Sequence, residues 1–380
     1  MKKFLTLIAL AVFPFVNANA ETNFKLDAAG DVYFVTDNDK LRVSQDGIYK
    51  VGRERKFAIY NPIKGVTGIN HAFLMGRVEA DVCRVNVGGG MLGETMRFHI
   101  EEANVALKLF SDLWIEGGYF SPIFAGDEDY SFNAWFTGNS LTDYFGSGYE
   151  SGIGLFYEID PKKTMRVKAV NFAYERISNN TNITFFSCYE WSDAFALKDW
   201  YLAAGTMFGN ENPIDESQSL RTLSALHIKG NITEKLAADL RLKFATLEDG
   251  KIDDNQESAT ATGYTTQLML RYALSDKYSI GFRFAYTSDE DGIFITNDNG
   301  TSWGGENIST GYSGIDFGVI FEYRPLSNAY IRLEGNILSL SNSKDTHYAN
   351  IFLVGDDMES TRLEAAISMG YNFSLLELVK

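Results

Sequence analysis

The sequence is poor in the residue types that build compact disulfide-bonded domains and metal centres. It has two cysteines, Cys83 and Cys188, and four histidines in 380 residues. Two cysteines outside a Cys-x-x-Cys spacing are too few for a disulfide scaffold or a thiolate metal site, so we expect two buried free thiols, with one disulfide as the alternative. The sequence also contains no His-Glu-x-x-His pair, Gly-x-Ser-x-Gly elbow or phosphate-binding loop. We therefore expect no enzyme activity, no bound metal and no cofactor.

Long apolar runs are absent after the first twenty residues. A membrane-spanning helix needs about 18 to 20 apolar residues, and no later segment approaches that length. Residues 4–16 form a shorter apolar run that Pro14 interrupts, preceded by Lys2 and Lys3 and followed by small residues at 17–20. This order predicts a secretory signal peptide over residues 1–20, with cleavage after Ala20, rather than a membrane anchor.

Basic residues are outnumbered. The chain has 34 lysines and arginines against 50 aspartates and glutamates, a formal charge of −16, and loss of Lys2 and Lys3 with the signal peptide makes it −18. An acidic surface repels phosphate groups, and Arg53-Glu54-Arg55-Lys56 is the longest basic cluster. Nucleic acid is therefore not an expected partner.

The chain does have a repeated two-residue alternation of apolar and polar side chains. In residues 276–287, Ile280, Phe282 and Phe284 alternate with Gly281 and Arg283. The same pattern recurs over residues 24–34, 236–244, 264–272, 315–323 and 363–373. Runs of about ten residues with one apolar and one polar face match strands that cross a bilayer at a tilt, and tyrosines bracket several of them, as in membrane barrels.

A soluble β-sandwich shows the same alternation of apolar and polar residues, so the lengths of the connections must distinguish it from a membrane barrel. Short turns near residues 111, 161, 234, 276 and 326 alternate with longer polar segments, which is the layout of outer-membrane barrels. The sequence predicts an all-β fold, a closed antiparallel transmembrane barrel of about 16 strands (range 14–18) over residues 21–373. The expected strands include 48–61 and 69–87, with a short external loop near 88–90 and an extra hairpin near 352–354. Residues 374–380 are expected to form a C-terminal periplasmic extension.

The final strand ends in Tyr371-Asn372-Phe373, which resembles the C-terminal signal that the outer-membrane assembly machinery reads. This machinery is therefore an expected partner during biogenesis, together with the bilayer and outer-membrane lipids. The expected location is the bacterial outer membrane, with the loops exposed at the cell surface.

The sequence resembles two protein families. Residues 98–107 (FHIEEANVAL) and 113–122 (LWIEGGYFSP) resemble a phrase of phosphate-selective and OmpL-like porins, in which a Glu-Glu-Ala strand is followed by a Gly-x-Phe-x-x-Pro strand. Overall length, signal peptide and acidic, cysteine-poor composition are similar to the variable surface proteins of intestinal spirochaetes. The first resemblance implies a porin, the second an abundant surface antigen or adhesin-type barrel without significant pore activity.

A barrel of 16 strands is too wide for side chains alone to fill, so we expect a water-filled diffusion channel for small polar solutes, with many such barrels being homotrimers. In known 16-stranded porins the third external loop folds inward, and here the longest gap, 121–149, falls third. The alternative is a solvated surface loop. The residues expected at a constriction are the loop carboxylates and the basic side chains of the neighbouring wall, namely Asp127, Glu128, Asp129, Asp143, Arg77, Arg97 and His99. The acidic composition predicts a weak cation preference.

Overall fold

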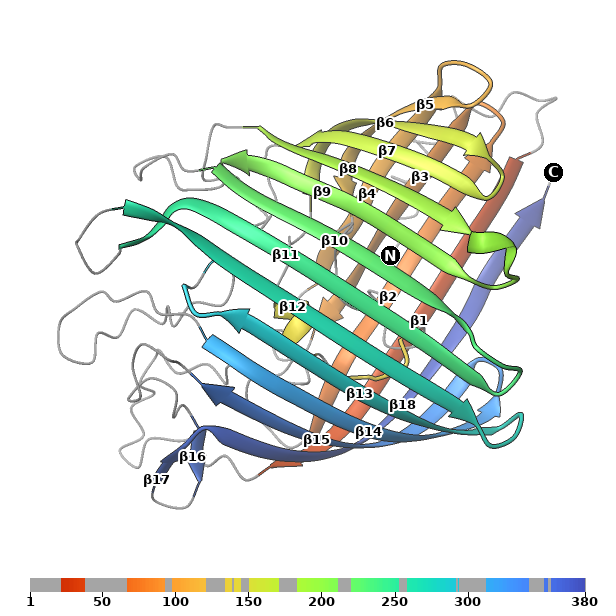
Figure 1. Cartoon of the computed structure of the whole chain (residues 1–380). Helices are drawn as coiled ribbons and strands as arrows, with labels where there is room; N and C mark the ends of the chain where they lie inside the picture. The colour runs from red at the N-terminus through yellow and green to blue at the C-terminus, as the bar shows by residue number, and fades with distance from the viewer. Residues whose placement is uncertain are drawn as a thin grey trace.

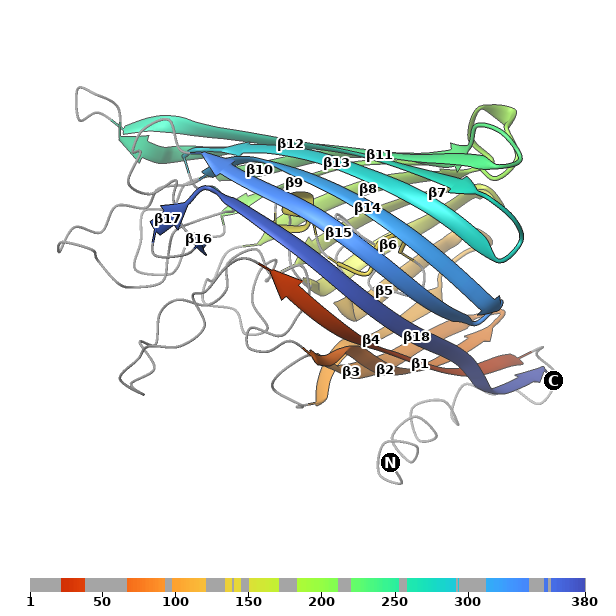
Figure 2. The same cartoon turned by 90° about the horizontal axis from the view of Figure 1, so that it is seen from below.

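The chain forms one closed antiparallel β-barrel, seen from two sides in Figures 1 and 2. The computed structural model describes residues 22–37, 67–92, 98–120, 134–138, 140–144, 150–170, 183–210, 220–252, 258–291, 293, 312–341, 352–354 and 357–379. Neighbours in sequence are neighbours in the ring throughout, and β1 closes the ring by pairing with β18. The predicted fold class and the predicted count of 16 strands in the ring are confirmed.

The strands of the ring are β1 (Thr22–Asp37), β2 (Thr67–Ala80), β3 (Cys83–Leu92), β4 (Phe98–Lys108), β5 (Leu113–Phe120), β6 (Glu150–Asp160), β7 (Lys163–Val170), β8 (Thr184–Ser192), β9 (Tyr201–Asn210), β10 (Leu220–Asn231), β11 (Leu236–Ile252), β12 (Ser258–Ala273), β13 (Tyr278–Asp289), β14 (Tyr312–Leu326), β15 (Ala329–Ser341) and β18 (Thr361–Val379). A separate hairpin of β16 (Phe352–Val354) and β17 (Asp357–Glu359) occupies the connection before β18, where we expected one.

The alternation of apolar and polar side chains along each strand gives the barrel wall an apolar outer face and a polar inner face. On β13 the outward Phe282 is 45 % exposed, whereas Arg283 beside it is 0 % exposed and points to the interior. Apolar side chains face outward in the same way on most strands of the ring, as on β14, β15 and β18. Such an outer surface suits hydrocarbon, and the backbone N–H and C=O groups of the strands pair with those of neighbouring strands in the closed ring. In the part of the chain that the structure describes, no helix is both long and apolar enough to span a bilayer.

The strand boundaries near the N-terminus differ from prediction. The segment 69–87, predicted as one strand, is split by a turn at Asp81 and Val82 into β2 and β3. The predicted loop near 88–90 lies inside β3, because Gly88, Gly89 and Gly90 pair with residues of β2. The predicted strand 48–61 lies outside the described residues. Residues 67–92 therefore supply two strands of the ring, where the sequence predicted one.

The short connections share one construction. In the β4–β5, β10–β11 and β12–β13 turns, the N–H of an apolar residue donates to the carbonyl four residues later, as in Leu109 to Leu113 (2.8 Å), Ile232 to Leu236 (2.8 Å) and Leu274 to Tyr278 (2.9 Å). These turns lie at one end of the barrel, at the right in Figure 1, and the β16–β17 hairpin lies at the other end. The predicted alternation of short and long connections is confirmed among the described strands.

Tyrosines form cross-strand pairs at both ends of the outer face. Tyr264 and Tyr286 have ring centroids 5.8 Å apart towards the long-loop end, and Tyr278 stacks on Tyr323 at 4.8 Å beside the short turns. Amphipathic rings at two levels suit the two interfaces of a bilayer. Both cysteines are free and buried, as expected.

The C-terminal residues continue the wall of the barrel. We expected residues 374–380 to form an extension beyond it, but residues 374–379 belong to β18 and pair with β1, from Asp27 opposite Ser374 to Asn23 opposite Val379. A β-bulge near Leu26 adjusts the register there. Antiparallel pairing with an already formed strand satisfies the backbone of this segment, which the alternation pattern up to Phe373 did not reveal.

Candidate functional site

Part of the third external connection, residues 121–149, lies inside the barrel. Its described residues 134–138 and 140–144 are called the inner segment here. The segment ends in the short 3₁₀ helix η3 (Leu141–Tyr144), which contacts β12, β13 and β14. Figures 1 and 2 show η3 within the ring of strands. The inner segment therefore narrows the interior on the side of β11–β15.

Glycines in the wall create the space that the inner segment fills. A Cβ atom at Gly318 would lie 3.1 Å from Cε1 of Phe136, and one at Gly314 would lie 3.1 Å from Cδ1 of Leu141. Gly281 is the third such position, where a Cβ would lie 3.7 Å from the Phe136 ring. Phe136 and Leu141 are each 2 % exposed. Close packing of Phe136 and Leu141 against the glycine positions of the wall fixes the position of the inner segment.

Two buried arginines bind the backbone of the inner segment. Arg283 on β13 donates to the carbonyl oxygen of Gly138 (2.6 Å), and Arg332 on β15 donates to the carbonyl of Ala134 (2.8 Å) and to Oγ1 of Thr137 (2.9 Å). Both arginines are 0 % exposed. A guanidinium has five N–H donors in a rigid plane, so one arginine can hold several groups of a loop in place.

Other interior groups complete this attachment. The Glu334 carboxylate accepts the backbone N–H groups of Thr137 (2.7 Å) and Gly138 (3.3 Å), while Thr137 also contacts Ser368 Oγ at 3.0 Å. Further along the segment, Lys243 donates to the carbonyl of Thr142 (3.1 Å). Two further side-chain hydrogen bonds join Ser140 to Gln267 and Thr142 to Thr265. Loop backbone buried away from water requires such partners.

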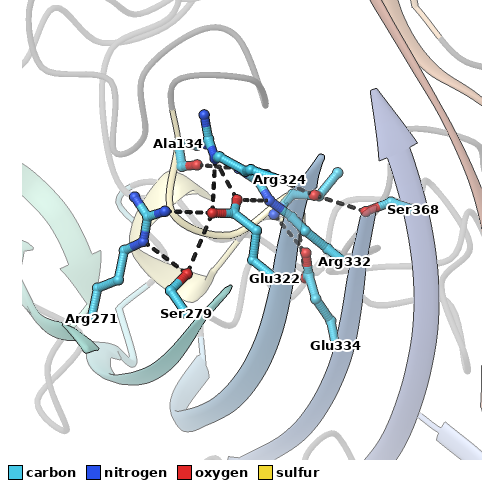
Figure 3. A network of polar contacts seen from close by, with 10 residues as sticks. Ala134, Arg271, Ser279, Glu322, Arg324, Arg332, Glu334 and Ser368 are labelled. Atoms are coloured by element: carbon cyan, nitrogen blue, oxygen red, sulfur yellow. Dashed lines mark hydrogen bonds and ion pairs between the residues drawn. The ribbon is translucent and has the colours of Figure 1, made fainter. Parts of the chain in front are cut away.

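One carboxylate beside the inner segment binds three arginines. Glu322 on β14 accepts from Arg332 Nε (2.7 Å), from Arg324 Nε (2.8 Å) and from Arg271 Nη2, and Figure 3 shows these contacts together with the hydroxyl of Ser279. Arg271 and Arg324 remain partly exposed, with side-chain values of 30 % and 23 %. Its three guanidinium groups surround one carboxylate, and two of them remain partly accessible to solvent.

Interior charges are distributed unevenly round the ring. On β10–β15, basic side chains outnumber acidic ones by eight to five. They are Arg221, Lys229, Arg241, Lys243, Arg271, Arg283, Arg324 and Arg332, against Asp239, Asp289, Asp316, Glu322 and Glu334. On β1–β9, leaving aside the turn pair Asp160–Lys163, carboxylates outnumber cations by nine to six. They are Asp27, Asp31, Glu79, Glu101, Glu102, Glu116, Glu150, Glu158 and Glu190, against Lys25, Arg77, Arg84, Lys108, Arg166 and Lys168. The two sectors create a field across the interior.

Two of the residues predicted at the constriction have side chains that the structure describes. Asp143 is in η3, where its Oδ2 accepts the backbone N–H of Ser140. Arg77 is on β2 and exposed to the interior, in the sector where carboxylates are in excess. The backbone of His99 lies in β4 opposite Gly90, and Arg97, Asp127, Glu128 and Asp129 lie outside the described residues.

The sequence reasoning missed the residues that attach the inner segment. Arg283, Glu322 and Arg332 were noticed only as the polar members of alternating strands or not at all. The available signal was that large charged residues recur at mid-strand positions of the inward face, which is unusual unless they are paired. In β4, a register shift in the pairing with β3 makes Glu101 a bulge residue beside Glu102.

An apolar cluster lines the interior on β7–β12. It consists of side chains that are at most 3 % exposed, namely Val170, Phe186, Met207, Leu223, Ala245, Ala261 and Ile293. Ile293 belongs to the connection after β13, and its N–H donates to Asp289 Oδ1 at 2.8 Å. This sector of the interior is therefore filled and dry near the long-loop end.

Comparison with known proteins assigns the family. The model of the family "Putative beta-barrel porin-2, OmpL-like" matches residues 16–373. The chain belongs to this OmpL-like porin family. The resemblance noted at residues 98–122 is thereby confirmed, and this porin shares with its family the outer-membrane barrel. No curated protein matches the sequence.

Solved structures similar to this porin are outer-membrane barrels. The channel DcaP of Acinetobacter baumannii has a TM-score of 0.59 at 10 % identity, with 94 % of this chain and 99 % of that chain covered. An anion-selective porin from Comamonas acidovorans has a TM-score of 0.58 at 8 % identity, covering 93 % and 100 %. OmpT of Vibrio cholerae lacking loop L8 has 0.53 at 12 % identity, covering 93 % and 99 %. At such identities the likeness concerns the fold alone.

Proposed function

We propose that this porin forms a water-filled diffusion channel for small polar solutes in the bacterial outer membrane. The observation that carries the proposal is the inner segment, which Arg283 and Arg332 fix to the interior wall of the net positive sector β10–β15, while β1–β9 form a sector of net negative charge. A fixed constriction with a transverse field admits small hydrated solutes and disfavours apolar ones, because an apolar solute must displace ordered water there.

The channel has a weak cation preference. Interior charges of the described wall are close to balance, whereas the whole chain without residues 1–20 has a formal charge of −18. The excess of carboxylates therefore belongs mostly to the connections at the mouths, where it attracts cations. Within this proposal Asp127, Glu128, Asp129 and Asp143 contribute the negative side of the constriction, and Arg77, Arg97 and His99 the positive side.

Planar-bilayer recording of the refolded chain without residues 1–20 tests this function. We expect stable ohmic steps and, in a KCl gradient, a reversal potential of the sign that means cation preference. Refolded barrels that insert without conductance would exclude the channel. Clear anion preference would remove the selectivity argument and leave the channel intact.

A second candidate function is a surface antigen or adhesin-type barrel without significant pore activity. The apolar cluster on β7–β12 favours it, because dry packing already occupies part of the interior. The loops would then be the functional part, exposed at the cell surface. The same recordings separate the two candidates, since a closed barrel gives no conductance steps.

Three partners complete the proposal. The outer apolar face binds outer-membrane lipids, and the C-terminal strand is read by the outer-membrane assembly machinery. The third partner is a second and third copy of the chain, because OmpT of Vibrio cholerae, similar in fold, has a trimer form. Light scattering of the detergent-solubilised barrel, corrected for bound detergent, distinguishes a homotrimer from a monomer.

A further inference from the structure

The β8–β9 turn, residues 193–200, is built differently from the other short connections at its end of the barrel (Figure 1). Eight residues separate Ser192 from Tyr201, whereas four separate Asn231 from Leu236 in the neighbouring β10–β11 turn. In the part of the chain that the structure describes, the non-glycine residues with positive φ all lie in the β8–β9 turn. They are Asp193 (φ 50°), Phe195 (φ 58°), Ala196 (φ 61°) and Asp199 (φ 63°). Unfavourable left-handed backbone is therefore concentrated at this one place.

Phe195 is an unfavourable residue for its place in the turn. Glycine adopts left-handed backbone at no cost and aspartate tolerates it, but a bulky aromatic residue adopts it rarely. The Phe195 side chain is also 52 % exposed, and Leu197 beside it is 48 % exposed. Polar residues would suit water better at both positions. An apolar ring on left-handed backbone, with half of its surface uncovered by the chain, indicates a partner outside the chain.

Hydrogen bonds hold the turn in this conformation. Asp193 Oδ1 accepts the backbone N–H of Asp199 (2.9 Å), and Asp193 Oδ2 pairs with the ammonium of Lys162 (2.8 Å). The N–H of Ala194 donates to the carbonyl of Trp200 (2.9 Å), and the Ala194 side chain is 0 % exposed. The base of the turn is thus packed and hydrogen-bonded, so the direction of the aromatic ring is fixed by the fold.

The Phe195 ring lies on the outer side of the barrel. It contacts the ring of Trp191, with centroids 5.2 Å apart. Glu190 points to the interior, so the alternation along β8 directs Trp191 outward. The ammonium of Lys163 lies 5.5 Å from the centroid of the Trp191 ring. An outward aromatic pair beside a lysine, at the level of the short turns, suits the zone where hydrocarbon gives way to lipid head groups.

Trp200 extends the same aromatic surface towards β10. A Cβ atom at Gly230, which alternates with the inward Lys229, would collide with the indole of Trp200, so the indole covers this glycine on the outer face. The indole N–H donates to the carbonyl of Asn231 (3.1 Å). In the neighbouring turn Ile232 is 53 % exposed at the same end of the barrel. The apolar outer surface of the strands therefore continues onto the β8–β9 turn.

We propose that the β8–β9 turn is a lipid anchor, in which Phe195 and Leu197 insert among the phospholipids of the periplasmic leaflet. The short turns of outer-membrane barrels are periplasmic, which selects this leaflet. The lysines at the base of the turn, Lys162 and Lys163, are each paired with an aspartate, so the anchor recognises acyl chains rather than anionic head groups. This inference rests on the lipid contact of the proposed function and deepens it, because it assigns a dedicated contact to one turn and one leaflet.

Fluorescence quenching by brominated phospholipids tests the anchor. The chain without residues 1–20 is refolded into phosphatidylcholine vesicles, and Phe195→Trp places a fluorescent ring in the turn. We expect bromines near the glycerol end of the acyl chains to quench the added emission about twofold or more, because an interfacial side chain lies within about 10 Å of the head-group boundary. Glu234→Trp, exposed in the β10–β11 turn, is the matched control and should keep its emission. Leu197→Trp is the second reporter for the case in which Phe195→Trp does not fold.

The outcomes separate the anchor from the channel. Unquenched emission from the folded reporter would overturn the anchor and leave a periplasmic protein as the occupant of this surface. Quenching of Glu234→Trp to the same extent would also overturn it, since the turn would then be no different from its neighbour. Quenching requires insertion but no conductance. An inserted and quenched barrel without conductance steps therefore refutes the channel and keeps the anchor, whereas a conducting barrel with an unquenched reporter refutes the anchor and keeps the channel.

Discussion

The guanidinium carbon of Arg283 lies 4.7 Å from the centroid of the Phe136 ring, and the same side chain donates to the carbonyl of Gly138. One arginine thus holds an aromatic ring by a cation–π contact and the backbone two residues later by a hydrogen bond. Since both partners belong to the inner segment, its position depends on the wall of β13 and β14. Substitutions in that wall should therefore act on the channel.

A large side chain at one of the wall glycines should displace the inner segment. In Gly318→Leu the new side chain occupies the place of Phe136, since even a Cβ there would lie 3.1 Å from its ring. We expect a loss of about 2 kcal/mol in the free energy of unfolding in urea and larger, noisier single-channel conductance. Gly335→Leu is the control, because a Cβ there would have Val319 Cγ2 as its nearest neighbour, at 3.5 Å on the outer face. Unchanged conductance in a folded Gly318→Leu variant would show that the segment does not limit ion flow.

Neutralising Glu322 should change both stability and selectivity. In Glu322→Gln, Arg271, Arg324 and Arg332 lose their shared negative partner, which we expect to cost about 3 kcal/mol or more of unfolding free energy. The sector of β10–β15 also becomes more positive by one charge, so the reversal potential in a KCl gradient should move towards anion preference. The conservative Glu322→Asp keeps the charge and should leave the reversal potential near that of the wild type. A shift of the same size in both variants would contradict the electrostatic explanation.

Glu334 should help to hold the inner segment in position against the wall. Its two carboxylate oxygens accept the N–H groups of Thr137 and Gly138, and a glutamine can offer only one acceptor there. Glu334→Gln should cost about 1 to 3 kcal/mol of unfolding free energy and increase the fluctuation of the open-channel current. Thr164→Val, which removes a hydroxyl contact to Glu190 on another sector, serves as the comparison. Identical current noise in the two variants would argue against this role.

A turn between β8 and β9 gives a pH-dependent prediction outside the membrane-spanning strands. The Lys162 ammonium, 2.8 Å from the carboxylate, and the N–H of Asp199 hold the pKa of Asp193 below its usual value. A depressed folded-state pKa stabilises the fold above the unfolded-state pKa, about 3.9, and this contribution is lost as the pH falls through the folded-state value.

Asp193→Asn isolates this charge, because asparagine also accepts the left-handed backbone of this position (φ 50°). The urea midpoint of the variant should be lower than that of the wild type at about pH 6 and should converge with it as the pH approaches about 2. Asp199→Asn, at φ 63° in the same turn, is the matched control. A gap between wild type and Asp193→Asn that does not change with pH would contradict the prediction.

Removal of residues 374–380 should weaken the barrel. Residues 374–379 pair with Asn23–Asp27 of β1, so the truncated chain leaves that edge of β1 without these partners. We expect a smaller heat-resistant folded fraction in gel-shift assays and a lower urea midpoint. Replacement of the same segment by an alternating serine and threonine stretch should restore part of the loss, since it keeps backbone pairing; no difference between truncated and complete chains would show that the segment is dispensable.

The sequence predicted those features of the fold that local alternation encodes. Strands such as β13, with Phe282 outward and Arg283 inward, were predicted within two residues of their ends, because each position reports directly whether lipid or the interior lies beside it. The split of 69–87 at Asp81 and Val82 was missed because Val82 continues the apolar pattern through the turn. The glycine run at 88–90 indicated a loop. In the structure these residues belong to the wall, where Gly88 leaves room for the side chain of Met75.

The site was less predictable for a physical reason. The inward course of the third connection was expected from its place in the chain, but its contacts join residues separated by more than a hundred positions, as in Arg283 to Gly138. No local period reports such a pairing. Charge alone selected the acidic residues of that connection, while the described contacts are made by apolar side chains such as Phe136 and Leu141, by serine and threonine hydroxyls and by backbone groups.

The β1–β18 seam has a consequence for biogenesis. β1 is the first strand to be synthesised and β18 the last, yet they are neighbours in the finished wall. Until β18 has been made, the edge of β1 that pairs with β18 lacks this partner, and loop closure between strands so far apart in the sequence makes their pairing slow. A chain that ends before β18 leaves this edge of β1 without its partner, and an unpaired strand edge is a template for aggregation.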